Sequence, residues 1–166
     1  MPSVYVIRAN FGKYSTSFIR GGYVGIGWLP AVDLTLIKTR EDLSSIFERE
    51  RRTNTNNLDV ERQIGQIERF LLEMREGDYV VTPDSNTETI HYGIVAPNPS
   101  YYYFSGSDGC PFPHRRKVKW NRLGIEENDF SLPFQHTIRS PLEVFQISPE
   151  RNFLNMSGDT IWFQRK

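Results

Sequence analysis

An amphipathic helix that runs into a strand and a hairpin is the feature that most constrains the fold of this chain. Apolar residues recur at helical spacing and form one stripe, made of Val60, Ile64, Ile67, Leu71 and Met74. Gly77 and Asp78 end this helix, and a strand is expected at 79–82. A turn at 83–86 leads to a second strand at 89–96. A one-sided helix beside two paired strands requires layers of helix and sheet.

The rest of the chain adds further strands and short helices. Strands are expected at 3–8, 22–27 and 115–120, and 142–147 reads as a short strand or a helix edge. A capping box at 39–42 predicts the start of a helix, and a helical turn is expected near Pro133. We therefore predict an α+β fold in which five or six short strands form a curved open barrel flanked by two or three helices. We expect a single domain over residues 1–166.

Composition excludes several classes of protein. The 20 basic residues balance the 20 acidic ones, so the net charge does not indicate a polyanionic partner. The single cysteine, Cys110, excludes an internal disulfide and a cysteine-cluster zinc site. No apolar run reaches the roughly 18 residues of a membrane helix, and no secretory signal is visible. We expect a cytoplasmic protein with no membrane partner.

Catalytic signatures are weak. The three histidines, His91, His114 and His136, lack metal-ligand spacing. Asp84 and Glu88 resemble a nuclease carboxylate pair, but the lysine that such a site needs is replaced by Ile90. The glycines near residue 25 do not form a dinucleotide loop. We expect no cofactor, no metal and no catalytic residue, so this chain alone is not expected to be an enzyme.

Two stretches suggest contact with nucleic acid. Residues 114–122 are basic with no acidic residue, and a strand there places Arg115, Lys117 and Lys119 on one face. Phosphate would neutralise such a row, although a solvated edge strand with protective lysines is an equal alternative. Residues 101–104 and Phe112 are aromatic within a loop, where rings can stack on bases. The alternative is a strand with alternate rings in the core.

Trp28 is the strongest single candidate for a binding residue. It follows Gly27 at the end of the strand at 22–27, and Gly27 lacks a side chain that would cover the indole. Asn10 and Asp33 offer hydrogen-bond donors and acceptors nearby, and an asparagine can pair with the adenine edge. An aromatic wall with a few aimed polar groups is how enzymes and readers hold a flipped base.

The order of these motifs resembles YTH and EVE domains of the PUA-like superfamily. V-I-R-A-N at 6–10, the strand that ends at Trp28, and Gly77-Asp78 before the next strand carry the likeness. I-G-W, G-D-Y-V-V and P-H-R-R-K-V-K-W together are similar to the N-terminal domains of Mrr-type modification-dependent restriction endonucleases. The resemblance covers about residues 3–122. It implies a PUA-like open barrel with a pocket for a methylated base.

The resemblance also implies roles for individual residues. Trp28 would be one wall of an aromatic cage, Tyr103 or Phe112 the other, with Ala9 and Asn10 at the base edge and Asp33 near the ring nitrogen. Phosphate would be held by the basic side chains Arg8, Lys13, Arg115, Arg116 and Lys119. The chain departs from the YTH pattern because its second-wall loop carries tyrosine and phenylalanine where YTH domains have tryptophan.

The function expected from the resemblance is recognition of a methylated base, N6-methyladenine or 5-methylcytosine in DNA. The chain would be the specificity domain of a modification-dependent restriction system, with a nuclease on another segment or partner. Two alternatives are a stand-alone enzyme that acts on a nucleotide or small anion, with Asp33 as a base, and an RNA reader of N6-methyladenine.

Overall fold

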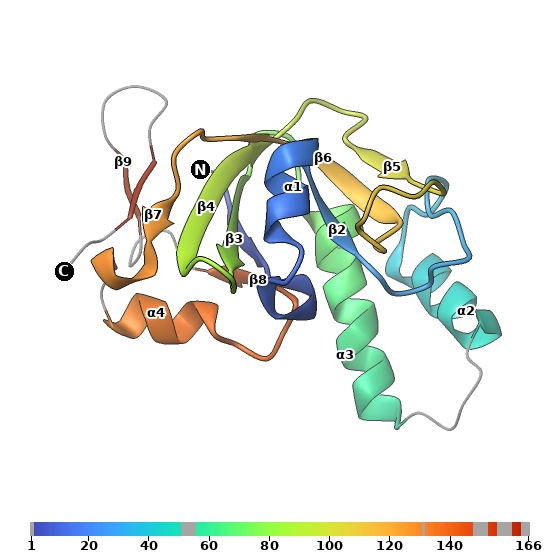
Figure 1. Ribbon diagram of the computed structural model, residues 1–166. Helices are drawn as coiled ribbons and strands as arrows, with labels where there is room; N and C mark the ends of the chain where they lie inside the picture. The colour runs from blue at the N-terminus through green and yellow to red at the C-terminus, as the bar shows by residue number, and fades with distance from the viewer. Residues whose placement is uncertain (1, 51–55, 131, 148–152, 156–160, 164–166) are drawn as a thin grey trace.

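The computed structural model describes residues 2–50, 56–130, 132–147, 153–155 and 161–163. It is an α+β fold built on a curled sheet, and this open half-barrel confirms the expected layers of helix and sheet (Figure 1). Six of the eight strands of this sheet form its continuous path, in the order β2 (Tyr23–Ile26), β6 (His114–Trp120), β4 (Thr89–Val95), β3 (Tyr79–Asp84), β1 (Val4–Ile7) and β8 (Val144–Ile147). β5 (Tyr101–Tyr103) pairs with β6, β7 (Ile125–Glu126) pairs with β4, and β9 (Phe153–Asn155) with β10 (Ile161–Phe163) forms a separate pair.

Strand pairing is antiparallel except between β1 and β3. β1 joins β3 in parallel, with Val4 opposite Tyr79, because α1, β2, α2 and α3 lie between them in the chain. β3 and β4 form the expected hairpin, in which Asp84 pairs with Thr89. The structure differs from the expected loop at residues 101–103. These residues form the strand β5, which pairs with β6, in agreement with the alternative prediction of a strand over the aromatic run.

Four α-helices are described: α1 (Ser15–Gly21), α2 (Arg40–Glu50), α3 (Asn57–Glu68) and α4 (Leu132–Ile138). The capping box of α2 is confirmed, because Thr39 Oγ1 accepts from the Asp42 amide at 3.1 Å and Asp42 Oδ2 accepts from the Thr39 amide at 3.2 Å. α3 continues into a π-helical turn (Arg69–Glu73), while Ala9–Gly12 and Glu127–Asp129 form short 3₁₀ turns. The π-turn shifts the register, so that Phe70 is buried whereas Leu71 is only partly covered.

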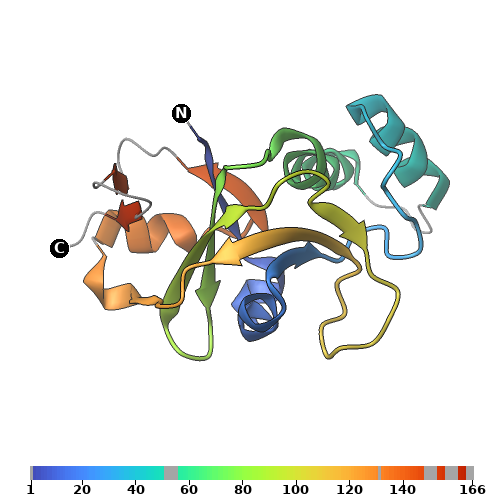
Figure 2. The same ribbon diagram turned by 90° about the horizontal axis from the view of Figure 1, so that it is seen from above.

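The central strands separate two apolar cores. Tyr5 and Ile7 of β1 face the core that contains α3 and β2, while Val4 and Val6 face a second core with α4. Figure 2 shows α4 and α2 at opposite ends of the molecule. The buried side-chain amide of Gln66 links α3 to the start of β8, because its Oε1 accepts from the backbone amides of Glu143 at 2.7 Å and Val144 at 3.1 Å.

Candidate functional site

The candidate site is a cavity of about 430 Å³ at the end of β2. Trp28 forms part of its wall and is half-buried against the main core. Phe47 and Glu50 of α2 and Gln63 of α3 also line it, and the remaining wall is the chain at 29–32. Two aromatic rings, an amide and a carboxylate therefore surround a space within the usual size range of small-molecule sites.

The segment at 28–34, the Trp28 loop, is fixed by hydrogen bonds from β5 and β6. His114 Nε2 lies 2.8 Å from the Leu29 carbonyl oxygen, and its Nδ1 lies 2.9 Å from the Tyr101 hydroxyl. Because a carbonyl only accepts, Nε2 carries the proton, and Nδ1 accepts from Tyr101. Tyr101 in turn accepts from the Leu34 amide at 3.0 Å. This network holds Trp28 in place before any ligand binds.

The network predicts a dependence of stability on pH. Burial lowers the pKa of His114 below its usual 6.5, so the folded protein keeps this ring neutral. Below about pH 6.5 the His114 ring binds a proton in the unfolded state but not in the folded state. The free energy of unfolding therefore decreases as the pH is lowered, until the pH reaches the pKa of His114 in the folded protein. Urea unfolding from pH 7 to pH 5 should show this slope, and H114Q should reduce it. H91Q serves as the comparison, because burial lowers the pKa of His91 too. A pH slope in H114Q equal to that of the wild type would contradict this role of His114.

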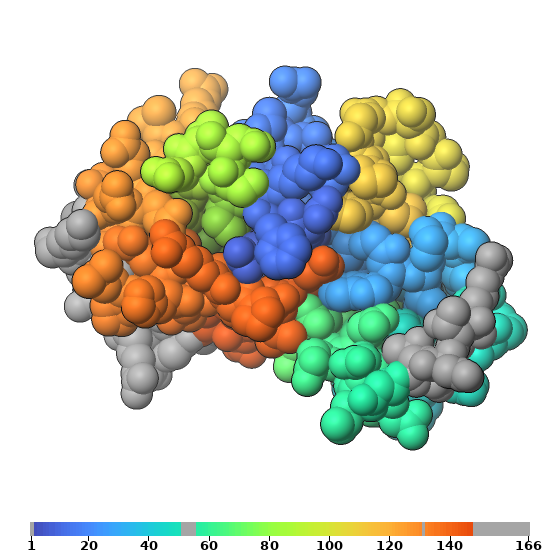
Figure 3. Space-filling view, turned by 60° about the horizontal axis from the view of Figure 1, so that its bottom comes forward, coloured from blue at the N-terminus to red at the C-terminus, as the bar shows by residue number. Residues whose placement is uncertain are grey.

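A second group of polar residues lies beside the Trp28 loop. The Glu143 carboxylate is 3.4 Å from the Asn10 amide, and burial raises the pKa of Glu143 above its usual 4.5. Figure 3 shows the turn after β1, the Trp28 loop, α3 and the chain before β8 on one face, in dark blue, light blue, green and orange-red. A carboxyl with a perturbed pKa at such a junction is a candidate ligand contact.

Of the residues predicted to read the base edge, none lines the cavity. Ala9 is buried in the core, and Asn10 is exposed at the turn after β1. Asp33 is exposed, and its Oδ1 accepts from the Thr35 hydroxyl at 2.5 Å and from the Thr35 amide at 2.9 Å. These bonds lower the pKa of Asp33, which makes this carboxylate a turn cap and a weak general base.

The predicted second wall is also displaced. Tyr103 supports the Trp28 loop from outside the cavity, because its hydroxyl donates to the Pro30 carbonyl at 2.5 Å. Phe112 packs at 5.1 Å from the Tyr14 ring, and a Cβ on Gly27 would lie 3.1 Å from the Phe112 ring. Gly27 therefore accommodates Phe112 rather than uncovering the indole. Phe47, rather than Tyr103 or Phe112, is the second aromatic residue that lines the cavity.

The predicted phosphate contacts at Arg115 and Arg116 are corrected by burial. Arg115 is 2% exposed and lies between the rings of Tyr23 and Phe104, 4.2 and 3.9 Å from their centroids. Its guanidinium donates to both carboxylate oxygens of Asp108, at 2.6 and 2.9 Å. Asp108 neutralises Arg115 from the preceding loop, so the expected repulsion along β6 does not arise.

Arg116 faces the other side of β6 and is 3% exposed. Its guanidinium donates to the carbonyl oxygens of Phe70 and Met74, at 2.9 and 2.8 Å, and to Ser100 Oγ at 2.8 Å. Lys13 and Lys119 are exposed and remain open to phosphate, whereas the partly buried Arg8 donates to the Ser140 carbonyl at 2.5 Å.

Sequence reasoning missed Phe47, Glu50, Gln63 and Glu143. The capping box gave the position of α2, and the helical period gave that of α3, but neither pattern shows which partly buried side chains of the two helices share a cavity with Trp28. Glu143 lies beside Asn10 only because β8 pairs with β1.

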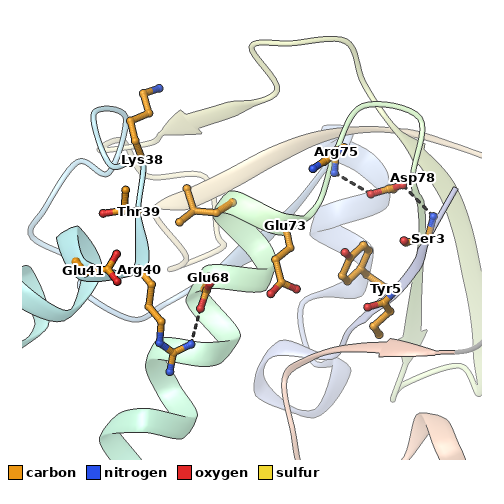
Figure 4. A pocket seen from close by; sticks show the side chains of 12 residues that line it. Ser3, Tyr5, Lys38, Thr39, Arg40, Glu41, Glu68, Glu73, Arg75 and Asp78 are labelled. Atoms are coloured by element: carbon orange, nitrogen blue, oxygen red, sulfur yellow. Dashed lines mark hydrogen bonds and ion pairs between the residues drawn. The ribbon is translucent and has the colours of Figure 1, made fainter.

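A larger hollow, about 790 Å³, lies elsewhere, between β1, α2 and the end of α3 (Figure 4). Two of its carboxylates already have partners: Glu68 bonds to Arg40, and Asp78 accepts from the backbone amides of Ser3 and Arg75 at 3.0 and 2.8 Å. We place the candidate site at Trp28 because that smaller cavity combines aromatic walls with unlike polar groups.

Comparisons with known proteins give a family without an assigned activity. A family model described as "Domain of unknown function (DUF8426)" matches residues 7–140. No curated protein and no solved structure matched the chain. Within the described residues, side chains of the metal-ligating types do not gather in a group of three or more, and every helix is too short or too polar to span a lipid bilayer.

Proposed function

The chain belongs to the DUF8426 family, and we propose that it recognises a methylated base extruded from DNA. The observation that carries this proposal is the cavity in which Trp28 and Phe47 provide aromatic walls and Gln63 and Glu50 provide polar groups. An extruded base is flat and apolar on its faces and polar at its edge, which matches such a lining.

The lining suits the two modified bases in different ways. A glutamine amide can donate to and accept from an adenine edge, so Gln63 favours N6-methyladenine. A carboxylate accepts from the amino group of cytosine, so Glu50 favours 5-methylcytosine. The methyl group itself gains about 0.8 kcal/mol when it is buried against the rings.

Phosphate contacts in this proposal come from exposed lysines. Lys13 lies on the turn after β1, and Lys117 and Lys119 lie on the outer face of β6. Three exposed lysines on a chain with a net charge of zero imply a modest electrostatic contribution to the DNA affinity. Recognition of the base therefore supplies most of that affinity.

The open half-barrel with flanking helices is compatible with a PUA-like fold. We propose that the chain is the specificity domain of a modification-dependent restriction system, with the nuclease on another segment or partner. Absence of a nucleophile–base pair among the residues that line the Trp28 cavity favours recognition over chemistry.

A binding panel tests the proposal. Fluorescence anisotropy would compare DNA oligonucleotides with one N6-methyladenine, one 5-methylcytosine or no modification, as duplex and single strand, and matched RNA. We expect preference for one methylated DNA over plain DNA by roughly threefold or more, from methyl burial. Equal affinity across the panel would refute the proposal. A preference for the methylated RNA would identify the chain as an RNA reader instead. Cleavage of an oligonucleotide by this chain with a divalent metal would identify it as an enzyme.

A further inference from the structure

The turn after β1 presents an aromatic ring to solvent. Phe11 is 65% exposed, and the guanidinium of Arg8 lies 5.3 Å from its ring centroid. Phe11 also lines a hollow of about 270 Å³ beside the turn between β3 and β4 and the end of α4. Exposed single apolar residues are common, so exposure alone does not make Phe11 functional. The backbone that carries it is the second observation.

Three consecutive residues of this turn are left-handed. Asn10 has φ 49° and ψ 47°, Phe11 has φ 56° and ψ 30°, and Gly12 has φ 79°. This conformation is unfavourable for phenylalanine and persists only where the surroundings enforce it. A Cβ at Gly12 would lie 2.4 Å from the Pro83 carbonyl oxygen, and Ser15 Oγ donates to the Gly12 carbonyl at 3.0 Å. β3 and α1 thus hold the turn in one shape with Phe11 outward.

The turn lies next to the candidate site. Phe112 contacts Tyr14 on one side and Gly27, the residue before Trp28, on the other. The Asn10 amide also points to Glu143, beside α3. The turn and the Trp28 loop adjoin on the face drawn in Figure 3. A duplex that covers this face would contact both segments.

We propose that Phe11 inserts into the base stack and fills the space left by the base that Trp28 receives. This inference rests on the proposed function. Proteins that unstack or extrude bases commonly insert an apolar side chain at the step they open, and a preset ring avoids a rearrangement on binding.

The test separates opening of the duplex from binding of the base. F11N removes the ring, and asparagine tolerates the left-handed conformation, so the turn is kept. F11L retains an apolar wedge, and L123A removes an equally exposed apolar side chain at another place, 77% exposed. Affinities would be measured for the methylated base in three forms: paired in a duplex, opposite an abasic site, and in a single strand.

We expect F11N to lose about tenfold or more on the paired duplex, where unstacking must be compensated, and to match the wild type within about twofold on the single strand. F11L and L123A should stay near the wild type on all three. Equal losses on duplex and single strand, or no loss on the duplex, would overturn the insertion while leaving base recognition intact. If the wild type shows no methyl preference on any form, the proposed function fails, and the insertion fails with it.

Discussion

Replacing Trp28 with alanine is expected to abolish the preference for methylated DNA and to weaken binding by roughly 5- to 150-fold, because stacking of a base on an aromatic ring is worth about 1–3 kcal/mol. The indole is the wall of the cavity that comes from the sheet, and its loop is fixed by His114 and Tyr101 before binding. Titration by fluorescence anisotropy with methylated and plain oligonucleotides would measure both effects.

Three further variants define what the loss means. W28F retains a ring and should keep most of the methyl preference, which separates stacking from general damage. F47A should reproduce a large part of the W28A effect, because Phe47 lines the same cavity. L123A removes an exposed apolar side chain that does not line the cavity and should change affinity little. Full methyl preference in W28A, with the fold intact by circular dichroism, would show that the cavity is not the base site.

Replacing Arg116 with methionine is expected to lower the free energy of unfolding by about 3–5 kcal/mol, because each buried polar group left unpaired costs about 1–3 kcal/mol. The methionine would leave the carbonyl oxygens of Phe70 and Met74 without this donor inside the core. Burial lowers the pKa of Arg116 to about 10, so the guanidinium is still charged and fully able to donate at neutral pH.

Urea denaturation of R116M beside K119M gives a matched comparison on one strand. Lys119 is exposed on the outer face of β6, so K119M should change stability by less than about 0.5 kcal/mol. A loss in R116M below about 1 kcal/mol would mean that the π-turn finds other partners for its carbonyls. R116K should fall between the two, because a single ammonium cannot reproduce the fork of the guanidinium.

Local patterns predicted most of the fold. The capping box at Thr39, the stripe that includes Ile64 and Ile67, and the hairpin after Asp78 each depend on neighbours a few residues apart, and each is confirmed. The strand β5 was predicted only as an alternative to a loop, because three adjacent tyrosines carry no alternation of polar and apolar residues.

The errors at the site arise from distant contacts. Arg115 and Arg116 were read as surface cations because their partners, Asp108 and the carbonyls of the π-turn, are brought to them only by folding. The same holds for the cavity, which residues of α2 and α3, rather than the aromatic loop, line together with Trp28. Sequence reasoning therefore found the candidate ring and missed its neighbours.

The amide of Gln66 has a consequence for aggregation. A sheet that curls without closing leaves edge strands, and unpaired amides on such an edge can recruit a strand from another molecule. At the start of β8, the amides of Glu143 and Val144 already donate to Gln66 Oε1. At these two positions the β8 edge therefore has no free backbone amide that could pair with a strand of another molecule. The half-barrel can remain open for a ligand without exposing these two donors.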